Sequence, residues 1–284
     1  MTETVASPAH QLSEETLAFY RRAMETLQNA AIPFLVGGAY AYARYTGIVR
    51  HTKDFDVFIH PRDFERTLDA FARGGCQVQR NFPHWLGKAW CGDDFVDVIF
   101  SSGNGVARVD SRWFEHAIDE EVLGMQVKLC PAEEMIWSKS FIMERERFDG
   151  ADVAHLLHCR ANELDWTRLV GRFGEHGRVL LAHLILFGYI YPDDAERIPR
   201  QALDTLCEQV KFDLEKAERR DPAQEKRLCR GPILSRGQYL TDIEEWGYHD
   251  ARLEPLGRMT EEEVEIWTAE ARREEQRQME KKVD

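Results

Sequence analysis

The stretch FLVGGAYAYARYTGIVRHTKDFDVFI, residues 34–59, decides how the rest of the sequence is interpreted. It begins with a short apolar run that ends at Gly37 and Gly38. An alanine- and tyrosine-rich segment of helical composition follows, and the stretch closes on a strand pattern. Glycines at a turn from strand to helix offer backbone N–H groups to an anion such as a phosphate. We therefore expect a strand, a helix and a second strand, with an anion-binding turn after the first strand.

Two aspartates, Asp54 and Asp56, are separated by one apolar residue in the second strand. Side chains at positions i and i+2 of a strand project from the same face, where two carboxylates can hold one hard cation. Arg50 and Lys53 lie just before them and could offset phosphate charge. The combination predicts a site for a metal-bound polyphosphate. For the Asp-x-Asp motif alone, solvated acids at a strand end or a glycosyltransferase-type motif are the alternatives.

A third carboxylate, Asp97, lies in the strand-like run FVDVIF. In strand alternation it shares a face with Phe95 and Ile99, which are apolar. Because an unpaired buried carboxylate is costly, a cation or a hydrogen-bond partner is implied. If this strand lies beside the Asp54–Asp56 strand, three carboxylates converge. Such a set can bind two divalent ions about 4 Å apart.

The overall composition is that of a globular protein, with 284 residues, 43% hydrophobic and 31% charged. The net charge of −13 argues against broad binding to nucleic acid, although a local basic groove remains open. Six scattered cysteines have no metal-site spacing, which is typical of a reducing cytoplasm. The N-terminus does not resemble a signal peptide, and the longest apolar run, residues 179–190, is shorter than the roughly 20 residues of a membrane span. We expect a soluble, cytoplasmic protein.

The pattern of elements predicts an α+β fold with a mixed sheet, followed by a mostly α-helical domain. The expected strands are 32–36, 53–59, 76–80, 84–91, 95–100 and 125–129. A helix is expected from Ser13, which can cap it, and others at 40–45, 60–74, 132–147, 149–159, 165–173, 178–190 and 201–219. Three regions result: a core over 1–130, a helical domain over 131–260, and a charged helix or tail over 261–284.

In this order, the motifs VGGAYA, R-x-T-K-D-x-D and a later strand aspartate resemble the nucleotidyltransferase superfamily that includes DNA polymerase β. The likeness is greatest to its small bacterial branches, the AbiEii-like proteins and the aminoglycoside nucleotidyltransferases. The segment PAEEMIWSKSFIMERERFDGADVAHLL, residues 131–157, is similar to the segment that follows the core in AbiEii-like members. Many members have Gly-Ser where this chain has Gly37-Gly38, but the double-glycine form also occurs in the family.

The resemblance implies a polymerase-β-like core and Mg²⁺-dependent transfer of a nucleoside monophosphate from an NTP, such as ATP, to an acceptor hydroxyl, with release of pyrophosphate. The triphosphate would be held at Gly37 and Gly38, assisted by Arg50 and Lys53.

The implied metal ligands are Asp54, Asp56 and Asp97, with two Mg²⁺ ions, and Asp97 could instead help to deprotonate the acceptor. On the AbiEii likeness, Lys139 and Asp152 are further candidate active-site residues. A lysine and an aspartate on helices also commonly pair with each other.

A second hypothesis from a different functional class stays open. It is a non-catalytic nucleotide-binding protein, or a toxin–antitoxin interaction protein, on the same fold. Three carboxylates kept together favour the enzyme, because their mutual repulsion is costly without a cation. The acceptor, the preferred base and the oligomeric state are not given by the sequence. An antibiotic, a tRNA end, a protein side chain and a small metabolite are all possible acceptors.

Overall fold

The chain forms two units in the computed structural model, which describes residues 12–50, 52–218 and 227–280. The first unit comprises residues 1–103 and 107–135, and the second comprises residues 104–106 and 136–284. The boundary between the two units falls after Met135, within a helix, whereas the sequence predicts it at residue 130. Residues 281–284 of the predicted tail lie outside the described ranges.

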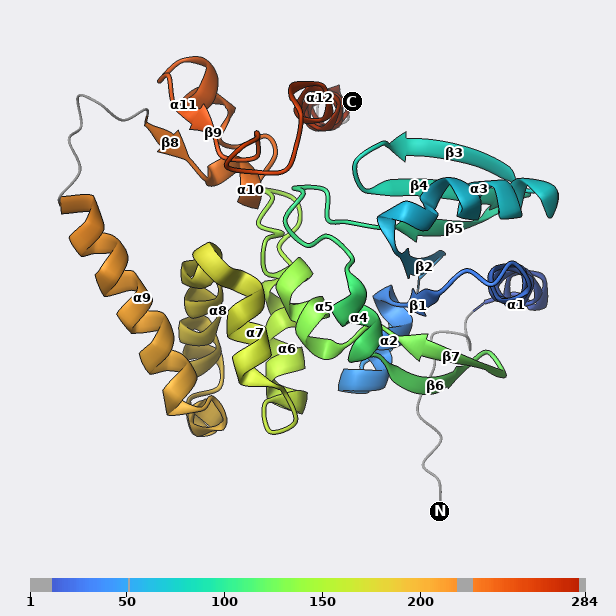
Figure 1. Ribbon diagram of the computed structural model, residues 1–284, viewed down its shortest axis with the longest axis horizontal. Coiled ribbons are helices and arrows are strands. Elements are labelled where there is room, and N and C mark those ends of the chain that lie inside the picture. The colour runs from blue at the N-terminus through green and yellow to red at the C-terminus, as the bar shows by residue number, and fades with distance from the viewer. Residues whose placement is uncertain (1–11, 51, 219–226, 281–284) are drawn as a thin grey trace. The chain divides into compact units, whose positions relative to one another are not determined.

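The first unit is built on one seven-stranded sheet with the order β3-β4-β5-β2-β1-β7-β6, which Figure 1 shows strand by strand. The pairs β2–β5 and β1–β7 are parallel and the other pairs are antiparallel. The prediction of an α+β fold with a mixed sheet is therefore confirmed. The strands are β1 (Phe34–Val36), β2 (Asp54–Ile59), β3 (Gln77–Phe82), β4 (Leu86–Cys91), β5 (Asp94–Ile99), β6 (Ile118–Val122) and β7 (Met125–Leu129).

One face of this sheet is covered by a helix. Tyr20 stacks on Phe55 of β2, with ring centroids 4.7 Å apart, so the helix that carries Tyr20 covers the face to which Phe55 points. Phe55 and Val57 are fully buried there. Because side chains alternate along a strand, Asp54 and Asp56 point to the opposite face. The helices and 3₁₀ turn of this unit are α1 (Glu14–Asn29), α2 (Gly38–Thr46), η2 (Pro61–Asp63), α3 (Phe64–Arg73) and α4 (Ser111–Glu115).

The N-terminus of α1 agrees with the sequence prediction in detail. The Ser13 hydroxyl accepts a hydrogen bond from the backbone N–H of Thr16 at 3.1 Å, which is the expected cap. Tyr20, Met24 and Leu27 are buried on one face of the helix. An N-terminal cap and a 3.6-residue apolar period are local signals, and here they were sufficient.

Two elements of the first unit were not predicted. Strand β6, with the sequence IDEEV, carries three acids in five residues and lies at the edge of the sheet, where exposed charge is tolerated. It pairs with β7, which was predicted with its observed bounds. Helix α4 has only five residues and depends on the cap made by the side chain of Asp110.

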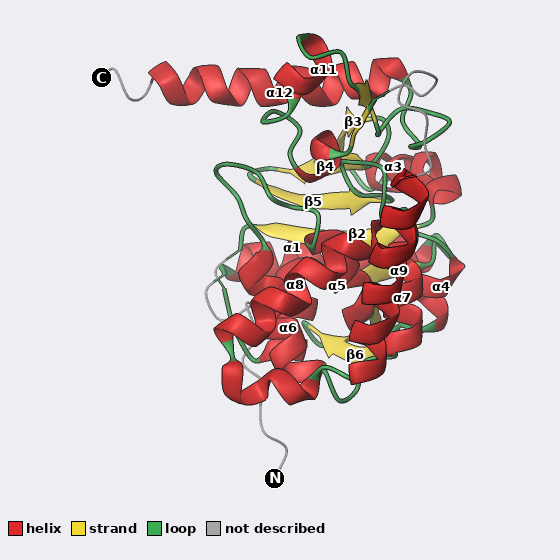
Figure 2. Ribbon diagram, turned by 90° about the vertical axis from the view of Figure 1, so that its left-hand side faces the viewer, coloured by secondary structure: helices red, strands yellow, loops and turns green. Residues whose placement is uncertain are grey.

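The second unit is mostly helical, as predicted. Its elements, with helix α5 entering from the first unit, are α5 (Ala132–Lys139), α6 (Gly150–Arg160), α7 (Trp166–Phe173), η3 (Gly174–His176), α8 (Gly177–Ile190), η4 (Pro192–Arg197), α9 (Arg200–Glu218), β8 (Leu228–Cys229), α10 (Gly231–Leu234), α11 (Leu240–Glu244), β9 (His249–Asp250) and α12 (Glu261–Glu280). The last is drawn as one long helix in Figure 2. Within the described ranges, no helix combines the length and the apolar character needed to cross a membrane.

The predicted helix over 132–147 was wrong in its second half. Helix α5 ends at Lys139, and the chain then turns back on itself through a bridge between Met143 and Phe148. The backbone N–H of Met143 donates to the carbonyl of Leu234, almost a hundred residues later in the sequence. Contacts of that range override the helical composition of the segment.

Candidate functional site

The register between β2 and β5 brings the predicted carboxylates together. These strands are parallel, with Asp54 opposite Phe95 and Asp56 directly opposite Asp97. Neighbouring strands lie about 4.8 Å apart, and residues in register point to the same face. Asp54, Asp56 and Asp97 therefore share one face at one end of the sheet, which was the condition set by the sequence.

The second glycine of the turn lies against the carboxylate of Asp56. Gly38 has a φ of +51°, and a Cβ built on it would lie 1.8 Å from Asp56 Oδ2. No larger residue fits this position without displacing the aspartate. The structure therefore requires glycine at this position, because the backbone passes directly beside a carboxylate.

The first glycine is placed differently from what was expected. The N–H of Gly37 donates to the backbone carbonyl of Asp56 at 3.0 Å, so it extends the pairing of β1 with β2 and is not available to a phosphate. The N–H groups that open α2 begin at Gly38, and the first turn of a helix has no intrahelical acceptors for them. An anion at this turn would therefore be bound from Gly38 onward.

The two cations before β2 have different surroundings. The guanidinium of Arg50 lies over the ring of Tyr42, 4.7 Å from its centroid, and Nη2 is 3.3 Å from the Tyr42 hydroxyl. The side chain of Lys53 is exposed, and its backbone carbonyl accepts a hydrogen bond from Tyr20. Their predicted contact with a triphosphate stays a prediction.

The partner that the sequence required for Asp97 is Lys88, which sequence reasoning missed. Lys88 lies opposite Asp97 in the antiparallel pairing of β4 with β5, and its Nζ is 2.8 Å from Asp97 Oδ1. The contact is an ion pair rather than a well-aligned hydrogen bond. Burial raises the pKa of the Asp97 carboxyl, and Lys88 only partly opposes this rise. A lysine inside the otherwise apolar strand LGKAWC was the available signal.

The ammonium group of Lys88 is also held by aromatic rings. Its Nζ lies 3.8 Å from the centroid of the Phe95 ring and 5.7 Å from that of Trp90. Attraction between a cation and the faces of aromatic rings stabilises this position. Lys88 is thus fixed over one face of the sheet, with 19% of its side chain exposed.

The fit of this face to magnesium can be judged from its donors. Carboxylate oxygens are the ligands that Mg²⁺ prefers, and Asp54 and Asp56 supply them from one face of one strand. Among the described residues, however, no group of three or more His, Cys, Asp or Glu side chains is arranged to hold a metal ion. The two aspartates of β2 therefore fit a single ion, whereas Asp97 is engaged by Lys88.

Lys139 and Asp152 lie in the second unit and contact each other. Lys139 Nζ is 2.8 Å from Oδ2 of Asp152 and equally close to Oδ2 of Asp149. Asp149 also receives two hydrogen bonds of 2.9 Å from the guanidinium of Arg147. Burial alone would raise the pKa of Asp149, but these two cations outweigh it and lower the pKa to about 2. The network joins the C-terminus of α5 to the first turn of α6, and an active-site role for Lys139 and Asp152 stays a prediction.

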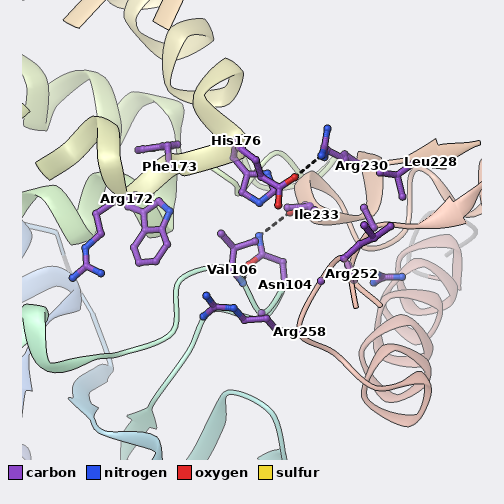
Figure 3. Close-up of a pocket in the computed structure, with 17 residues that line it drawn as sticks. Asn104, Val106, Arg172, Phe173, His176, Leu228, Arg230, Ile233, Arg252 and Arg258 are labelled. Carbon is purple, nitrogen blue, oxygen red and sulfur yellow. Dashed lines mark hydrogen bonds and ion pairs between the residues drawn. The ribbon is translucent and has the colours of Figure 1, made fainter. Parts of the chain in front are cut away.

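A cavity of about 220 Å³ lies within the second unit and is lined by none of the predicted site residues (Figure 3). Two of the arginines that line it form ion pairs. Arg230 pairs with Glu175, and Arg252 pairs with Asp250 while almost fully buried. Figure 3 shows Arg258 beside the loop of Asn104 and Val106. We assign this cavity no role.

A scan against models of protein families finds no match, and a search of curated proteins finds none either. Among solved structures, an antigenic nucleotidyltransferase-like protein from Paracoccidioides brasiliensis is 16% identical, with 68% of this chain and 98% of that chain covered and a TM-score of 0.44. The antibiotic-resistance factor ANT(2'')-Ia is 14% identical, with 73% and 96% covered and a TM-score of 0.39.

The lincosamide antibiotic adenylyltransferase LnuA is 12% identical, with 51% of this chain and 96% of that chain covered and a TM-score of 0.37. All three TM-scores are below 0.5. Nucleotidyltransferases are among the solved structures to which this chain is similar.

Proposed function

We propose that the chain is a Mg²⁺-dependent nucleotidyltransferase that transfers a nucleoside monophosphate from an NTP to an acceptor hydroxyl. The observation that carries the proposal is the register of Asp56 with Asp97, with Gly38 placed directly against the Asp56 carboxylate. The turn proposed to bind an anion therefore lies beside a carboxylate cluster on one face of the sheet. A metal-bound triphosphate needs both features at one place.

The roles of the residues follow from their chemistry. The N–H groups that open α2 from Gly38 would bind phosphate oxygens, and Asp54 and Asp56 would hold Mg²⁺. When bound, the ion neutralises charge on the phosphates and orients them. Arg50 and Lys53, which precede β2, would add positive charge beside the triphosphate.

In the reaction, the acceptor oxygen forms a bond to the α-phosphorus of the NTP. The bond from that phosphorus to the oxygen bridging to the β-phosphate breaks, and its electron pair leaves with pyrophosphate. The acceptor hydroxyl loses its proton, and Asp97 is the candidate base on the same face of the sheet. Such transfers depend mainly on positioning and charge neutralisation.

The proposal is tested by incubating the protein with Mg²⁺ and each labelled NTP, together with acceptor fractions from a cell lysate. We expect release of pyrophosphate and a labelled product with at least one fraction. Asp56→Asn should abolish both, because it removes a ligand of the ion. The matched control is Asp119→Asn on edge strand β6, where the side chain is 80% exposed, and it should retain activity. Full turnover in Asp56→Asn would contradict the proposal.

The alternative is a non-catalytic nucleotide-binding or toxin–antitoxin interaction protein, and the same experiment distinguishes it. That alternative expects Mg²⁺-dependent binding of an NTP, with no release of pyrophosphate from the NTP in the presence of any acceptor fraction.

A further inference from the structure

Lys88 lies two strands away from the proposed metal ligand Asp56 and takes part in none of the roles given above. The strands β4, β5 and β2 are neighbours, with Lys88 opposite Asp97 and Asp97 opposite Asp56. The three side chains therefore form one row across the sheet on the same face. In this row the lysine is at one end and the proposed metal ligand is at the other.

We propose that Lys88 takes the place of a second metal ion, so that the site binds one divalent cation. The inference rests on the proposed function. It differs from the expectation of two Mg²⁺ ions shared by Asp54, Asp56 and Asp97. In our proposal Asp54 and Asp56 hold the ion, and Asp97 remains a carboxylate paired with the lysine.

The charges of the cluster support one ion. Asp54, Asp56 and Asp97 carry three negative charges when ionised, and Lys88 carries one positive charge, which leaves two negative charges. One divalent cation balances them. Before a nucleotide binds, a second divalent cation would leave a net positive charge on the cluster that contains Lys88, and like charges repel strongly where solvent is partly excluded.

The geometry supports the same conclusion. Lys88 Nζ is 2.8 Å from Asp97 Oδ1, the distance of a close ion pair, and the side chains are only 19% and 13% exposed. The rings of Phe95 and Trp90 lie beside the same ammonium group. A cation therefore already engages Oδ1 of the Asp97 carboxylate. In agreement, the described residues contain no three-carboxylate arrangement that could hold an ion.

The experiment counts bound ions directly. Mn²⁺, which binds to the same carboxylate ligands and is visible by electron paramagnetic resonance, is titrated into the full chain in the presence of a non-hydrolysable NTP. Binding of Mn²⁺ to the nucleotide alone is measured separately and subtracted. We expect one protein-dependent ion per chain for the natural sequence.

Two variants of the carboxylates separate the roles. Asp97→Asn should still bind one ion with an affinity within about threefold of the natural protein, because its side chain is not a ligand. Asp56→Asn should lose the ion. Two ions in the natural protein, or loss of ion binding in Asp97→Asn, would overturn the inference while leaving the proposed function intact. No ion in the natural protein would overturn both.

Variants of Lys88 test whether this lysine excludes a second metal ion. Lys88→Met frees Asp97 and should bind a second Mn²⁺ ion, whereas Lys88→Arg keeps the charge and should bind one. The matched control is Lys128→Met, because Lys128 also lies opposite an aspartate, Asp119, in an antiparallel pair, with Nζ 3.1 Å from its carboxylate. It should bind one ion. A single ion in a folded Lys88→Met would show that Lys88 does not exclude the second metal. If Lys88→Met does not fold, the Asp97→Asn result decides.

Discussion

At the scale of single residues, the candidate site contains a contact so close that a larger side chain cannot be accommodated. Gly38 is the clearest example, because its positive φ and the Asp56 carboxylate act on the same position. The first feature affects stability, since a side chain in the left-handed region costs roughly 1–2 kcal/mol. The second affects the placement of a proposed metal ligand. The two effects can be separated by comparing Gly38 with a glycine that has a positive φ but no atom close to an added Cβ.

Gly38→Ala is expected to reduce nucleotidyl transfer by about 100-fold or more, because its Cβ displaces the Asp56 carboxylate and small displacements of catalytic groups have effects of that size. The control is Gly47→Ala, at a φ of +72° with no atom within 4 Å of the added Cβ. Both variants should lose similar stability in urea titrations, and only Gly38→Ala should lose activity. Equal activity in the two variants would refute a role for the Gly38–Asp56 contact.

At the scale of elements, the parts that were predicted correctly carry local signals. Ser13 caps α1 through its own hydroxyl, and β7 alternates between buried and exposed residues. The segment after Lys139 was predicted wrongly because its conformation depends on distant partners such as Leu234. The sequence alone could not establish that β2 pairs with β5, since nothing local specifies which strands are neighbours.

Lys88 could not be assigned from the sequence for the same reason. Its role depends on the register of β4 against β5, which sets Lys88 opposite Asp97 rather than opposite Asp94, three residues earlier in β5. The sequence indicated that Asp97 needed a cation. Only the order of strands in the sheet identifies it.

The ion-pair network at the junction between α5 and α6 is expected to make the stability of the protein depend on pH. The pKa of Asp149 is about 2, below its ordinary value of 3.8, because Arg147 and Lys139 favour the charged form. A carboxyl with a lowered pKa in the folded state contributes stability that is present above the unfolded pKa and is lost as the pH falls toward the folded pKa. We expect this contribution, about 2 kcal/mol, to be complete above pH 5 and to fall between about pH 4 and pH 2.

Asp149→Asn should therefore reduce the free energy of unfolding at pH 7 by about 2 kcal/mol and remove this part of the acid dependence. Urea titrations at several pH values measure both effects. The control is Asp204→Asn, because Asp204 is 69% exposed and lies 3.9 Å from Arg200, where an ion pair contributes little. An unchanged slope of stability against pH in Asp149→Asn would show that the network does not lower the pKa of this carboxyl.

At the scale of the whole molecule, stability and the proposed chemistry draw on different groups. Each unit has its own buried apolar side chains, among them Phe55 and Leu68 in the first and Phe173 and Phe187 in the second. The proposed metal ligands contribute little to this core: Asp54 is exposed and Asp56 is only half-buried. The metal should therefore serve the reaction and not the fold.

Removal of divalent ions with EDTA is expected to abolish nucleotidyl transfer while leaving the circular dichroism spectrum and the thermal midpoint nearly unchanged. Activity should return when Mg²⁺ is added in excess. Addition of Mg²⁺ together with an NTP at about 100 times its dissociation constant should stabilise the protein by about 2.7 kcal/mol, because a ligand that binds only the folded state shifts the equilibrium by mass action. Asp56→Asn should show the unperturbed spectrum without this stabilisation. Unfolding in EDTA alone would mean that an ion is part of the folded structure, and would contradict the separation of stability from chemistry.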